Sequence, residues 1–517
     1  MTGDDARIAD ILAWLGLHAA AAHRGDLQPD SRRIEAGDVF VALPGAVAGG
    51  DDGRRYLQAA RGRGAAAALV EAEGFAGADA GLPVLPVRQL RRVLGDLAAQ
   101  YYGRPSESMQ VVGVTGTNGK TSTAYWIAQT LSRAGRQCAV LGTVGSGFPG
   151  ESLADSTLTT PDAIALQREV LRLHEAGACA LAMEVSSIGL EQGRVNGMRF
   201  DVAVFTNLTR DHLDYHGTMQ AYEAAKALLF EWPTLAAAVL NLDDPAGRRL
   251  LSRLAGRVRA GALQVTGFTT AAGEVDPAGA AGVARLLSAR DIRAGADGLE
   301  FTLRCGQSEQ KIAAPLVGSF NVSNLLATIG AVLACGVDLE AACRIAPTLQ
   351  PPPGRMQRVR ACSGDEPLVV IDYAHTADAI EQALLALRPQ ADARRGRLWI
   401  VFGAGGDRDP GKRAPMGAAA GRYADRLVIT SDNPRSEDPS AIGAAVAAGA
   451  PARQGVELIV DRAEAIAYAL AAADDRDIVL IAGKGHEATQ DIGGVKRPFS
   501  DVEQARAALR ARAGVTC

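Results

Sequence analysis

Short apolar segments alternate with segments of helical spacing through the middle of the chain. Such alternation is typical of a doubly wound parallel sheet that helices cover on both faces. The β-branched and apolar runs predict buried strands at 111–114, 139–141, 180–185, 202–207 and 239–242. The predicted fold class is therefore α/β.

The pattern changes on either side of that region. Before it, the predicted elements are short helices, strands at 39–43 and 66–70, and a helix over 87–102. After it, alternating stretches between 265 and 316 predict a β extension, and a helix follows over 321–335. The strands predicted beyond residue 354 are 368–372, 398–402, 427–430 and 478–482, again alternating with helices.

Two segments rich in glycine and proline interrupt these patterns. The first contains Gly103, Pro105 and Ser106, and the second is Pro351-Pro-Pro-Gly354. A chain of 517 residues also exceeds what one hydrophobic core usually organises. We predict three domains: a smaller N-terminal α/β domain over 1–104, a central domain with the doubly wound parallel sheet over 105–350, and a Rossmann-like α/β domain over 351–517.

The charge composition argues against several classes of partner. The 54 basic and 58 acidic residues give a net charge of −4, which leaves no electrostatic footprint for nucleic acid or an anionic membrane. Asp4, Asp5 and Asp10 precede the first apolar stretch, the reverse of a signal peptide, and no apolar run reaches membrane-spanning length. The seven cysteines are scattered without metal-ligand spacing. We expect a reduced, cytoplasmic, monomeric protein without a nucleic-acid partner and without membrane insertion.

One glycine-rich segment has the pattern of a phosphate-binding loop. Gly113-Val-Thr-Gly-Thr-Asn-Gly-Lys-Thr-Ser122 lies between a predicted strand and a predicted helix over 122–134. In such a loop backbone N–H groups turn toward phosphates, the lysine adds charge near the β and γ groups, and the threonine hydroxyl can hold Mg²⁺. Val114 stands where the common pattern has glycine, and the alternative is a glycine-rich turn with a chance lysine. The flanking strand and helix favour binding of a nucleoside triphosphate by Gly116, Thr117, Asn118, Gly119, Lys120, Thr121 and Ser122.

Lysine is scarce in this chain. The only lysines are Lys120, Lys226, Lys311, Lys412, Lys484 and Lys496, and the other basic residues are arginines. A lysine kept against this bias is expected where a guanidinium cannot serve, because arginine is broader and does not lose its proton. We favour a covalently modified amine at Lys226, where the alternative is an ordinary surface lysine. Lys311 and Lys496 are expected to be surface residues.

Polar residues follow two strands of the central region, at the edge where open α/β sheets bind ligands. Glu184 ends one apolar strand, and Thr209-Arg-Asp-His-Leu-Asp-Tyr-His216 follows the next. Such groups can ligate or polarise a metal ion bound to phosphates. For any single residue the alternative is structural, with Asp211 or Asp214 capping a helix and the histidines exposed.

Three further polar loops follow strands of the last region. They are Gly403-Ala-Gly-Gly-Asp-Arg-Asp-Pro-Gly-Lys-Arg413, Ser431-Asp-Asn-Pro-Arg-Ser436 and Ala482-Gly-Lys-Gly-His-Glu487. Loops at one sheet edge can converge, and Arg408, Arg435 and Glu487 together suit a ligand with both carboxylate and ammonium groups, such as an amino acid. The alternative is turn chemistry, with Arg435 simply solvated.

Together these motifs resemble those of the Mur ligases. Besides Gly113 to Ser122, the motifs are Glu184-Val-Ser-Ser187, Asp211-His-Leu-Asp-Tyr-His-Gly217, Asp372-Tyr-Ala-His-Thr376, Gly406-Asp-Arg408 and Asp432-Asn-Pro-Arg435. The resemblance covers essentially the whole chain. It implies that ATP phosphorylates the D-glutamyl carboxylate of a UDP-linked muramoyl dipeptide and that the amine of an amino acid then attacks the acyl phosphate. The last motif is similar to that of the members that add meso-2,6-diaminopimelate rather than lysine.

The resemblance also implies a role for individual residues. Lys120, Lys226, Glu184 and His212 match catalytic residues, and Lys226 matches the lysine that the family carbamylates. The implied Mg²⁺ ligands are Thr121, Glu184, His212 and the carbamate of Lys226. Asn321, Asn324, Arg355 and His375 match residues beside the nucleotide. Contacts to the UDP-linked precursor are implied for Ser31, Thr159, Thr160, Ser186, Gln192 and Arg194. Contacts to diaminopimelate are implied for Arg408, Asp432, Asn433, Pro434, Arg435, Gly483 and Glu487.

The sequence departs from the family pattern at three places. Ile188 stands where a histidine often follows the paired serines, Ala377 replaces a usual proline, and the loop from Ala46 to Asp51 is a few residues longer. Two alternatives share the first loop. One is another amide ligase of the superfamily, either lysine-adding or a folylpolyglutamate synthetase, and the other is a P-loop regulator or kinase that forms no amide. Neither the synthetase nor the regulator needs a UDP-binding domain together with the motif from Asp432 to Arg435.

Overall fold

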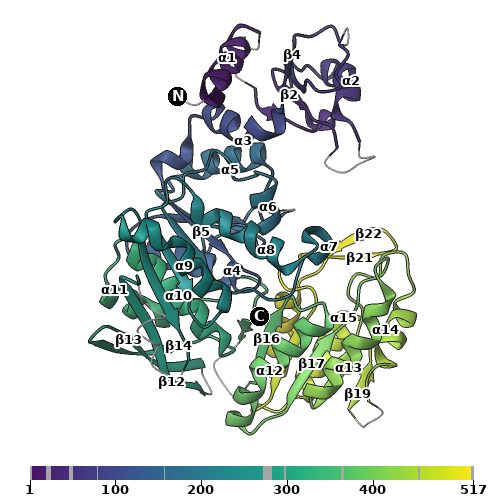
Figure 1. Ribbon diagram of the computed structural model, residues 1–517. Coiled ribbons are helices and arrows are strands. Elements are labelled where there is room, and N and C mark those ends of the chain that lie inside the picture. Colours follow the sequence, from purple (N-terminus) through teal and green to yellow (C-terminus); the bar gives the residue numbers. More distant parts are fainter. Residues whose placement is uncertain are drawn as a thin grey trace. The chain divides into compact units, whose positions relative to one another are not determined.

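The computed structural model describes residues 3–18, 25–45, 51–77, 80–156, 158–271, 282–295, 298–361, 366–451 and 455–513. By their contacts the residues group into two compact units. The first comprises Met1–Lys120, Gly135–Ala238 and Ala260–Leu263, and the second comprises Thr121–Ala134, Val239–Arg259 and Gln264–Cys517. Figure 1 labels those helices and strands of each unit for which there is room.

The first unit begins with a small parallel sheet of order β1-β2-β3-β4. Its elements are α1 (Gly3–His18), β1 (Leu27–Gln28), the 3₁₀ helix η1 (Ser31–Arg33), β2 (Val39–Ala42), η2 (Gly53–Tyr56), α2 (Leu57–Gly62), β3 (Ala67–Glu71), β4 (Val84–Val87) and α3 (Leu90–Tyr101). Successive side chains of β2 point to opposite faces. Val39 and Val41 pack against α1 and α3, whereas Phe40 and Ala42 pack against α2. Helices thus cover both faces, as an α/β domain requires.

The helix predicted over 87–102 begins later in the structure. Val87 ends strand β4, and α3 starts at Leu90. The carboxylate of Glu71 accepts hydrogen bonds from the backbone nitrogens of Gln89 and Leu90 at 2.9 and 2.8 Å, and Gln89 has a left-handed φ of 50°. A carboxylate at the end of β3 therefore caps the helix. Because Glu71 is far from Leu90 along the chain, the sequence pattern near residue 87 does not reveal where the helix begins.

The central strands of the first unit run in the order β9-β5-β8-β6-β7. The β5, β6, β8 and β9 pairings are parallel, and β7 is antiparallel to β6. The elements are η3 (Pro105–Ser108), β5 (Gln110–Thr115), β6 (Cys138–Gly142), β7 (Gly145–Gly147), α5 (Ala163–Glu175), β8 (Ala180–Glu184), α6 (Ser187–Glu191), β9 (Val202–Phe205), α7 (Leu213–His216), α8 (Met219–Ala227) and η4 (Leu228–Glu231). Val114 is level with Glu184, and Thr115 with Phe205, so the carboxyl ends of three strands share one edge.

The second unit contains the helix after the phosphate-loop motif and the predicted β extension. Strands β12, β13 and β14 pair antiparallel, which confirms the extension. The elements up to residue 348 are α4 (Lys120–Arg133), β10 (Ala237–Asn241), α9 (Pro245–Arg259), β11 (Gln264–Thr269), β12 (Arg285–Gly295), β13 (Gly298–Cys305), β14 (Ser308–Ala314), α10 (Phe320–Ala334), α11 (Leu339–Ile345) and η5 (Ala346–Thr348).

The C-terminal sheet has the order β15-β16-β20-β17-β18-β19. All its pairings are parallel except that of β15 with β16. Its elements are β15 (Gln357–Val359), β16 (Leu368–Asp372), α12 (Ala377–Arg394), β17 (Leu398–Phe402), η6 (Pro410–Lys412), α13 (Arg413–Tyr423), β18 (Arg426–Ile429), α14 (Pro439–Ala447), β19 (Val456–Leu458), α15 (Arg462–Ala472), β20 (Ile478–Ala482), the hairpin β21 (Thr489–Ile492) and β22 (Val495–Pro498), and α16 (Asp501–Arg512). Helices α12, α13 and α14 pack on one face, and α15 and α16 on the other.

Both predicted breaks are packed segments rather than open linkers. Ser106 is fully buried, and its hydroxyl accepts a hydrogen bond from the Arg199 nitrogen at 3.1 Å. At the second break, the carbonyl of Gln350 accepts hydrogen bonds from Trp126 Nε1 and Gln129 Nε2 at 2.9 and 3.1 Å. The three domain limits therefore stay a prediction.

Four smaller expectations concern two lysines, one loop, membrane-spanning helices and the cysteines. Lys311 and Lys496 are exposed, as predicted. Residues 46–50, where the loop is longer than in the family pattern, lie outside the described residues. Within the described ranges, no helix is both long and apolar enough to cross a membrane. The cysteines described there as free are Cys138, Cys179, Cys305, Cys335 and Cys343.

Candidate functional site

The phosphate-loop motif follows β5 and is held by the segment after β9. The backbone nitrogens of Thr117 and Asn118 donate to the backbone oxygen and side-chain oxygen of Asn207, at 2.8 and 2.9 Å. Thr206 Oγ1 donates to the Asn118 carbonyl at 2.6 Å. Gly116 has a φ of 147°, and a Cβ there would lie 1.9 Å from Thr206 Oγ1, so only glycine fits. The loop is therefore preformed by a neighbouring strand.

Two lysines point at one backbone oxygen of this loop. Lys120 Nζ donates to the carbonyls of Gly116 and Thr117 at 2.9 and 2.8 Å, and Lys226 Nζ donates to the Gly116 carbonyl at 2.8 Å. The side chain of Lys226, which comes from α8, is almost entirely buried. Burial, together with the nearby charge of Lys120, lowers the pKa of Lys226 to about 6. At neutral pH Lys226 is therefore largely an uncharged amine.

Tyr222 connects the loop to the histidine-rich segment. The Tyr222 hydroxyl is hydrogen bonded to Thr117 Oγ1 at 3.2 Å, and Lys226 Nζ lies 4.3 Å from the centroid of the Tyr222 ring. The rings of His212 and His216 lie 6.0 and 5.2 Å away. Burial raises the pKa of Tyr222 to about 12, so it acts as a neutral phenol. One turn of α8 thus supplies both Tyr222 and Lys226 to the site.

The two histidines of this segment differ in their surroundings. His212 has a left-handed φ of 50°, and its side chain is about half exposed beside Asp211. The ring of His216 is buried, with Nε2 hydrogen bonded to Ser187 Oγ at 3.0 Å and Nδ1 3.0 Å from Glu191 Oε2. Burial lowers the pKa of His216, against the raising effect of Glu191. His216 therefore has a structural position, and His212 is the accessible imidazole.

Glu184 ends β8, and its carboxylate is buried. Its two oxygens accept hydrogen bonds from the backbone nitrogen and hydroxyl of Thr143, at 2.7 and 3.3 Å. The Thr143 hydroxyl is also hydrogen bonded to Thr159 Oγ1 at 3.1 Å. Thr143 thus links a predicted metal ligand to a residue predicted to contact the UDP-linked precursor.

The structure joins four predicted precursor contacts in one network. Thr160 Oγ1 donates to the Glu184 carbonyl and accepts from the Ser186 nitrogen, at 3.1 and 3.0 Å. Arg194 donates to the Thr160 carbonyl at 2.9 Å and to Gln192 Oε1 at 2.9 and 2.7 Å. Ser31 does not belong to this network, because it lies in η1 beside the small N-terminal sheet. Among the described residues no hydrogen bond links Ser31 to these four.

The acidic groups near the loop suit a metal ion that is held mainly by a phosphorylated ligand. Within the described ranges no three His, Cys, Asp or Glu residues gather as a metal-binding cluster. Mg²⁺ commonly takes only one or two carboxylates and completes its shell with phosphate oxygens and water. Glu184 is one such carboxylate, and a carbamate on Lys226 would supply a second anionic group. The donor set therefore fits Mg²⁺ bound together with a nucleotide.

In the second unit, the residues predicted to lie beside the nucleotide form two groups. Asn324 Nδ2 donates to Asn321 Oδ1 at 2.9 Å within the buried first turns of α10. Arg355 and His375 gather around Tyr373, at 5.0 Å from its ring centroid for the guanidinium and 4.8 Å for the imidazole. Thr121 and Ser122 lie in the first turn of α4.

The three polar loops of the C-terminal sheet do converge. The Gly406 nitrogen donates to the Asn433 carbonyl at 2.9 Å, and Ser436 Oγ donates to Asp407 Oδ1 at 2.5 Å. Arg435 has a left-handed φ of 51°, and its guanidinium donates to the Gly406 carbonyl. Its nitrogen donates to the Asp491 carbonyl of the β21 hairpin at 3.0 Å. Arg408 is exposed on the same loop as Gly406.

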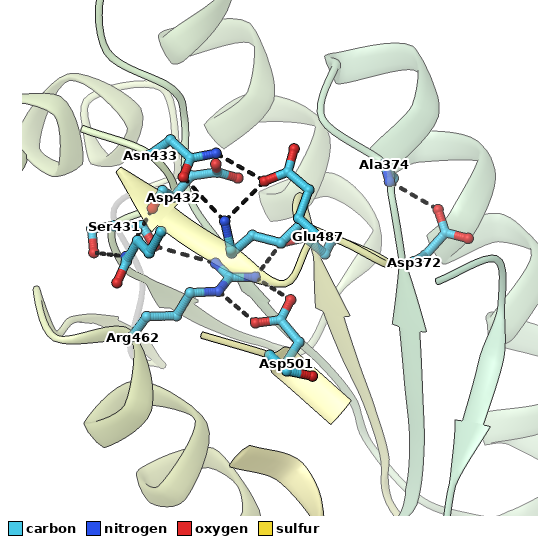
Figure 2. Close-up of polar contacts among 12 residues, drawn as sticks. Asp372, Ala374, Ser431, Asp432, Asn433, Arg462, Glu487 and Asp501 are labelled. Atoms are coloured by element: carbon cyan, nitrogen blue, oxygen red, sulfur yellow. Dashed lines mark hydrogen bonds and ion pairs between the residues drawn. The ribbon is translucent and has the colours of Figure 1, made fainter. Parts of the chain in front are cut away.

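The loop after β20 brings Gly483, Lys484 and Glu487 beside the loop after β18. Asn433 Nδ2 donates to Glu487 Oε2 at 2.9 Å (Figure 2). Gly483 has a φ of 113°, and a Cβ there would lie 2.5 Å from Asp432 Oδ2. Burial raises the pKa of Asp432, against the lowering effects of Arg462 and Lys484. Pro434 is buried in the same turn. Every residue predicted to contact diaminopimelate therefore lies on these converging loops.

Several residues of these sites were missed in the sequence. Thr143 and Arg462 carry no local signal, because their partners are distant along the chain, and no role was predicted for Tyr222 or Tyr373. Arg462 is fully buried, pairs with Asp501 through two contacts of 2.7 Å, and donates to the Ser431 and Ala482 carbonyls (Figure 2). Lys484 could be recognised in the sequence as a rare lysine in a glycine-rich loop, but no role was predicted for it.

Comparisons with known proteins identify the family of this chain. Residues 27–102 match the model described as the Mur ligase family, catalytic domain; residues 114–332 match the Mur ligase middle domain; and residues 354–485 match the Mur ligase, glutamate ligase domain. Two relatives are named UDP-N-acetylmuramoyl-L-alanyl-D-glutamate--2,6-diaminopimelate ligase. The one from Ralstonia nicotianae is 50% identical over 98% of this chain and 97% of its own. The one from Pseudomonas aeruginosa is 48% identical over 94% and 95%.

A solved structure gives the same result for the fold. It is the structure of a UDP-N-acetylmuramoyl-L-alanyl-D-glutamate--2,6-diaminopimelate ligase, and it matches with a TM-score of 0.68 and 37% identity over 94% of this chain and 95% of its own. This chain belongs to the Mur ligase family.

Proposed function

We propose that this protein is an ATP-dependent ligase that adds meso-2,6-diaminopimelate to the D-glutamate of UDP-N-acetylmuramoyl-L-alanyl-D-glutamate and releases ADP and phosphate. The observation that carries this proposal is the convergence of Arg435, Asn433 and Glu487 on the loops that follow β18 and β20, the two strands that flank β17. The two cations Arg408 and Arg435 and the carboxylate of Glu487 suit an amino acid with an additional carboxylate. The names of the relatives, at about half identity over nearly the full chain, support the same assignment.

The proposed reaction has two steps. An oxygen of the D-glutamyl carboxylate attacks the γ-phosphorus of ATP, and ADP leaves. The amine of diaminopimelate then attacks the acyl carbon, phosphate leaves with the former carboxylate oxygen, and the nitrogen loses a proton. Most of the catalysis is positioning and charge stabilisation, because phosphoryl transfer needs little covalent help from the protein.

The phosphate loop and its two lysines are proposed to hold the nucleotide. Backbone nitrogens from Gly116 to Thr121 can face the phosphates, and Lys120 can exchange its carbonyl contacts for the β and γ oxygens. Ser122 follows in the same turn. Asn321 and Asn324, together with Arg355 and His375, are proposed to contact the rest of the nucleotide.

Lys226 is proposed to act as a carbamate. Its largely uncharged amine can attack CO₂, form an N–C bond and lose a proton, which replaces a neutral amine with an anion. The carbamate would stand beside Lys120, whose charge opposes a cation at that position and favours an anion. Thr121, Glu184, His212 and this carbamate would hold Mg²⁺. The bound ion would neutralise charge that develops on the transferred phosphoryl group.

The other substrates are proposed to use the residue groups described above. The network of Thr160, Ser186, Gln192 and Arg194, with Thr159 beside it, is proposed to position the muramoyl dipeptide, and Ser31 its UDP end. Arg435 and Arg408 are proposed to bind the distal carboxylate of diaminopimelate. Lysine lacks that carboxylate, so a bound lysine would leave guanidinium groups without their partner.

The proposed reaction also places the protein in the cell. Its nucleotide-linked precursor and ATP are water-soluble, which supports action in the cytoplasm, in peptidoglycan precursor synthesis. The product would then serve cell wall biogenesis and, through it, cell shape and division.

Phosphate release tests the proposal against the alternatives. Purified protein would be given ATP, Mg²⁺ and UDP-muramoyl dipeptide with meso-diaminopimelate, L-lysine or no amine. We expect rapid release only with diaminopimelate, and a heavy-oxygen label in the D-glutamyl carboxylate should appear in the phosphate. Release that does not depend on the amine would favour a regulator or kinase, and preference for L-lysine would favour the lysine-adding class.

A further inference from the structure

Lys484 is one of six lysines in the chain, and its side chain is completely buried. Its ammonium donates hydrogen bonds to Asn433 Oδ1 at 3.1 Å and to Glu487 Oε2 at 2.9 Å. A buried ammonium is costly unless it is paired and hydrogen bonded. This lysine is therefore placed by Asn433 and Glu487, which belong to two different loops.

The three residues form a closed triangle. Asn433 Nδ2 also donates to Glu487 Oε2 at 2.9 Å, and Asn433 Oδ1 accepts a further hydrogen bond from the Asp491 nitrogen at 3.0 Å. One carboxylate oxygen of Glu487 is thus used by two inner donors. Figure 2 shows the other oxygen pointing away from Asn433. A third of the Glu487 side chain is exposed, so this second oxygen is available to a ligand.

A second buried cation fixes the backbone below the triangle. Arg462 donates to the carbonyls of Ser431 and Ala482, at 3.3 and 2.9 Å, and it is paired with Asp501 (Figure 2). Ser431 and Ala482 immediately precede the loops that carry Asn433 and Lys484. The two loops are therefore joined at their bases by Arg462, and their functional side chains are joined by Lys484.

We infer that Lys484 is a positioning residue that holds Glu487 with one oxygen directed at the ammonium group of the incoming amino acid. This inference rests on the proposed function. It adds Lys484 to the residues of the proposed diaminopimelate site and says what holds Glu487 in place there. Lys484 itself does not contact the substrate. It acts through Glu487, because a carboxylate that is fixed and ionised accepts an ammonium better than one that rotates and takes up protons.

The charges around Glu487 agree with this role. Burial raises the pKa of Glu487, but the hydrogen bond and charge of Lys484, the hydrogen bond of Asn433 and the charge of His486 outweigh burial and leave that pKa below its ordinary value. Asp432, Tyr373, Arg462 and Asp501 are the other titratable or charged groups nearby. Of the cations, only Lys484 forms a hydrogen bond with the Glu487 carboxylate among the described residues.

Lys484→Met tests the inference, because methionine has similar length and no charge. The matched control is Lys311→Met, which removes an exposed lysine from β14. We expect Lys484→Met to raise KM for diaminopimelate about tenfold or more, the cost of one charge-assisted hydrogen bond. KM for ATP and for UDP-muramoyl dipeptide should stay within about twofold. The acid limb of the pH profile of 1/KM for diaminopimelate should move to higher pH, because Glu487 then lacks its nearest cation.

A double-variant cycle separates positioning from a role in folding. Glu487→Gln removes the carboxylate on which Lys484 acts, so Lys484→Met should change KM for diaminopimelate by less than about twofold in that background. Lys484→Met alone leaves the partly buried Glu487 carboxylate without its cation. The doubly substituted protein has no carboxylate there, so its KM can be compared with that of Glu487→Gln even if Lys484→Met alone does not fold. Thermal unfolding confirms that each protein compared is folded.

The outcomes are distinct. Independent effects of the two substitutions on KM, or an unchanged pH profile in Lys484→Met, would overturn the inference while the wild-type protein still forms product. If the wild-type protein forms no product, the proposed function fails first.

Discussion

Lys120 and Lys226 donate hydrogen bonds to the same backbone oxygen, that of Gly116, at 2.9 and 2.8 Å. Two ammonium groups at one acceptor repel each other, and burial makes Lys226 the easier of the two to neutralise. The first site therefore combines a permanent cation with an amine that is ready for covalent modification. Because arginine cannot lose its proton under ordinary conditions, this arrangement explains why position 226 is lysine in an arginine-rich chain.

Lys226→Arg should abolish turnover. The guanidinium stays protonated and cannot take up CO₂, so the anion proposed at this position does not form. We expect kcat to fall at least about a thousandfold, as when a principal electrostatic group is lost. Steady-state kinetics with and without added bicarbonate measure the effect. A rate near that of the wild type would refute the carbamate role.

Lys226→Met should make the protein more stable at neutral pH and change how stability depends on pH. The folded pKa of about 6 lies below the unfolded value of 10.5, so between these values the unfolded chain binds one proton more. Wild-type stability should therefore rise with pH in that window, by up to about 1.4 kcal/mol per pH unit from this group. The variant should lack this contribution.

Thermal unfolding in CO₂-free buffer from about pH 6 to about pH 9 measures this difference. The difference in melting temperature between Lys226→Met and the wild type should be largest near pH 6 and should decrease as pH rises. A constant difference would show that Lys226 keeps its ordinary pKa in the folded protein.

Arg435→Ala should raise KM for diaminopimelate far more than KM for ATP. The substitution removes one guanidinium from the proposed carboxylate site, which we expect to cost about 2 kcal/mol or more, some 30-fold in KM. Arg506→Ala, which removes an exposed arginine from α16, is the control. Equal rises in both KM values would indicate a folding defect rather than a lost substrate contact.

Asp501→Asn should destabilise the C-terminal part of the chain. Arg462 and Asp501 are both fully buried, and the substitution leaves the guanidinium without its counter-charge, at a cost of about 3–5 kcal/mol. Asp392→Asn removes one of the two exposed partners of Arg388, which keeps its contact with Asp425, and should cost less than about 1 kcal/mol. Denaturant unfolding compares the two. Similar losses in both variants would mean that the buried pair contributes no more than a surface pair.

The sequence predicted the features that depend on local pattern. Strands such as 368–372, 398–402 and 478–482 appear in the structure with the same limits, because continuous apolar runs mark strands that are buried on both faces. The convergence of the three C-terminal loops followed from the rule that parallel strands end at one edge. The predicted start of α3 was wrong, since it depends on Glu71, and the first predicted break, at Gly103, Pro105 and Ser106, is a packed segment and not an open linker.

The supporting residues of the sites could not be predicted in the same way. Tyr222 contacts Thr117, 105 positions away, and Arg462 contacts Asp501, 39 positions away, so no local spacing reveals either pair. Lys484 was visible through its rarity, but its role depends on the Glu487 oxygen that it holds. The domain limits and the roles of the site residues remain predictions.

The mass of the reaction product tests the central claim most directly. Purified protein with ATP, Mg²⁺, UDP-muramoyl dipeptide and meso-diaminopimelate should convert the precursor into a species heavier by one diaminopimelate less one water, with one ADP formed for each. L-lysine in place of diaminopimelate should give little or no such product. Absence of the tripeptide product in the complete mixture, from protein that is folded and binds ATP, would contradict the account.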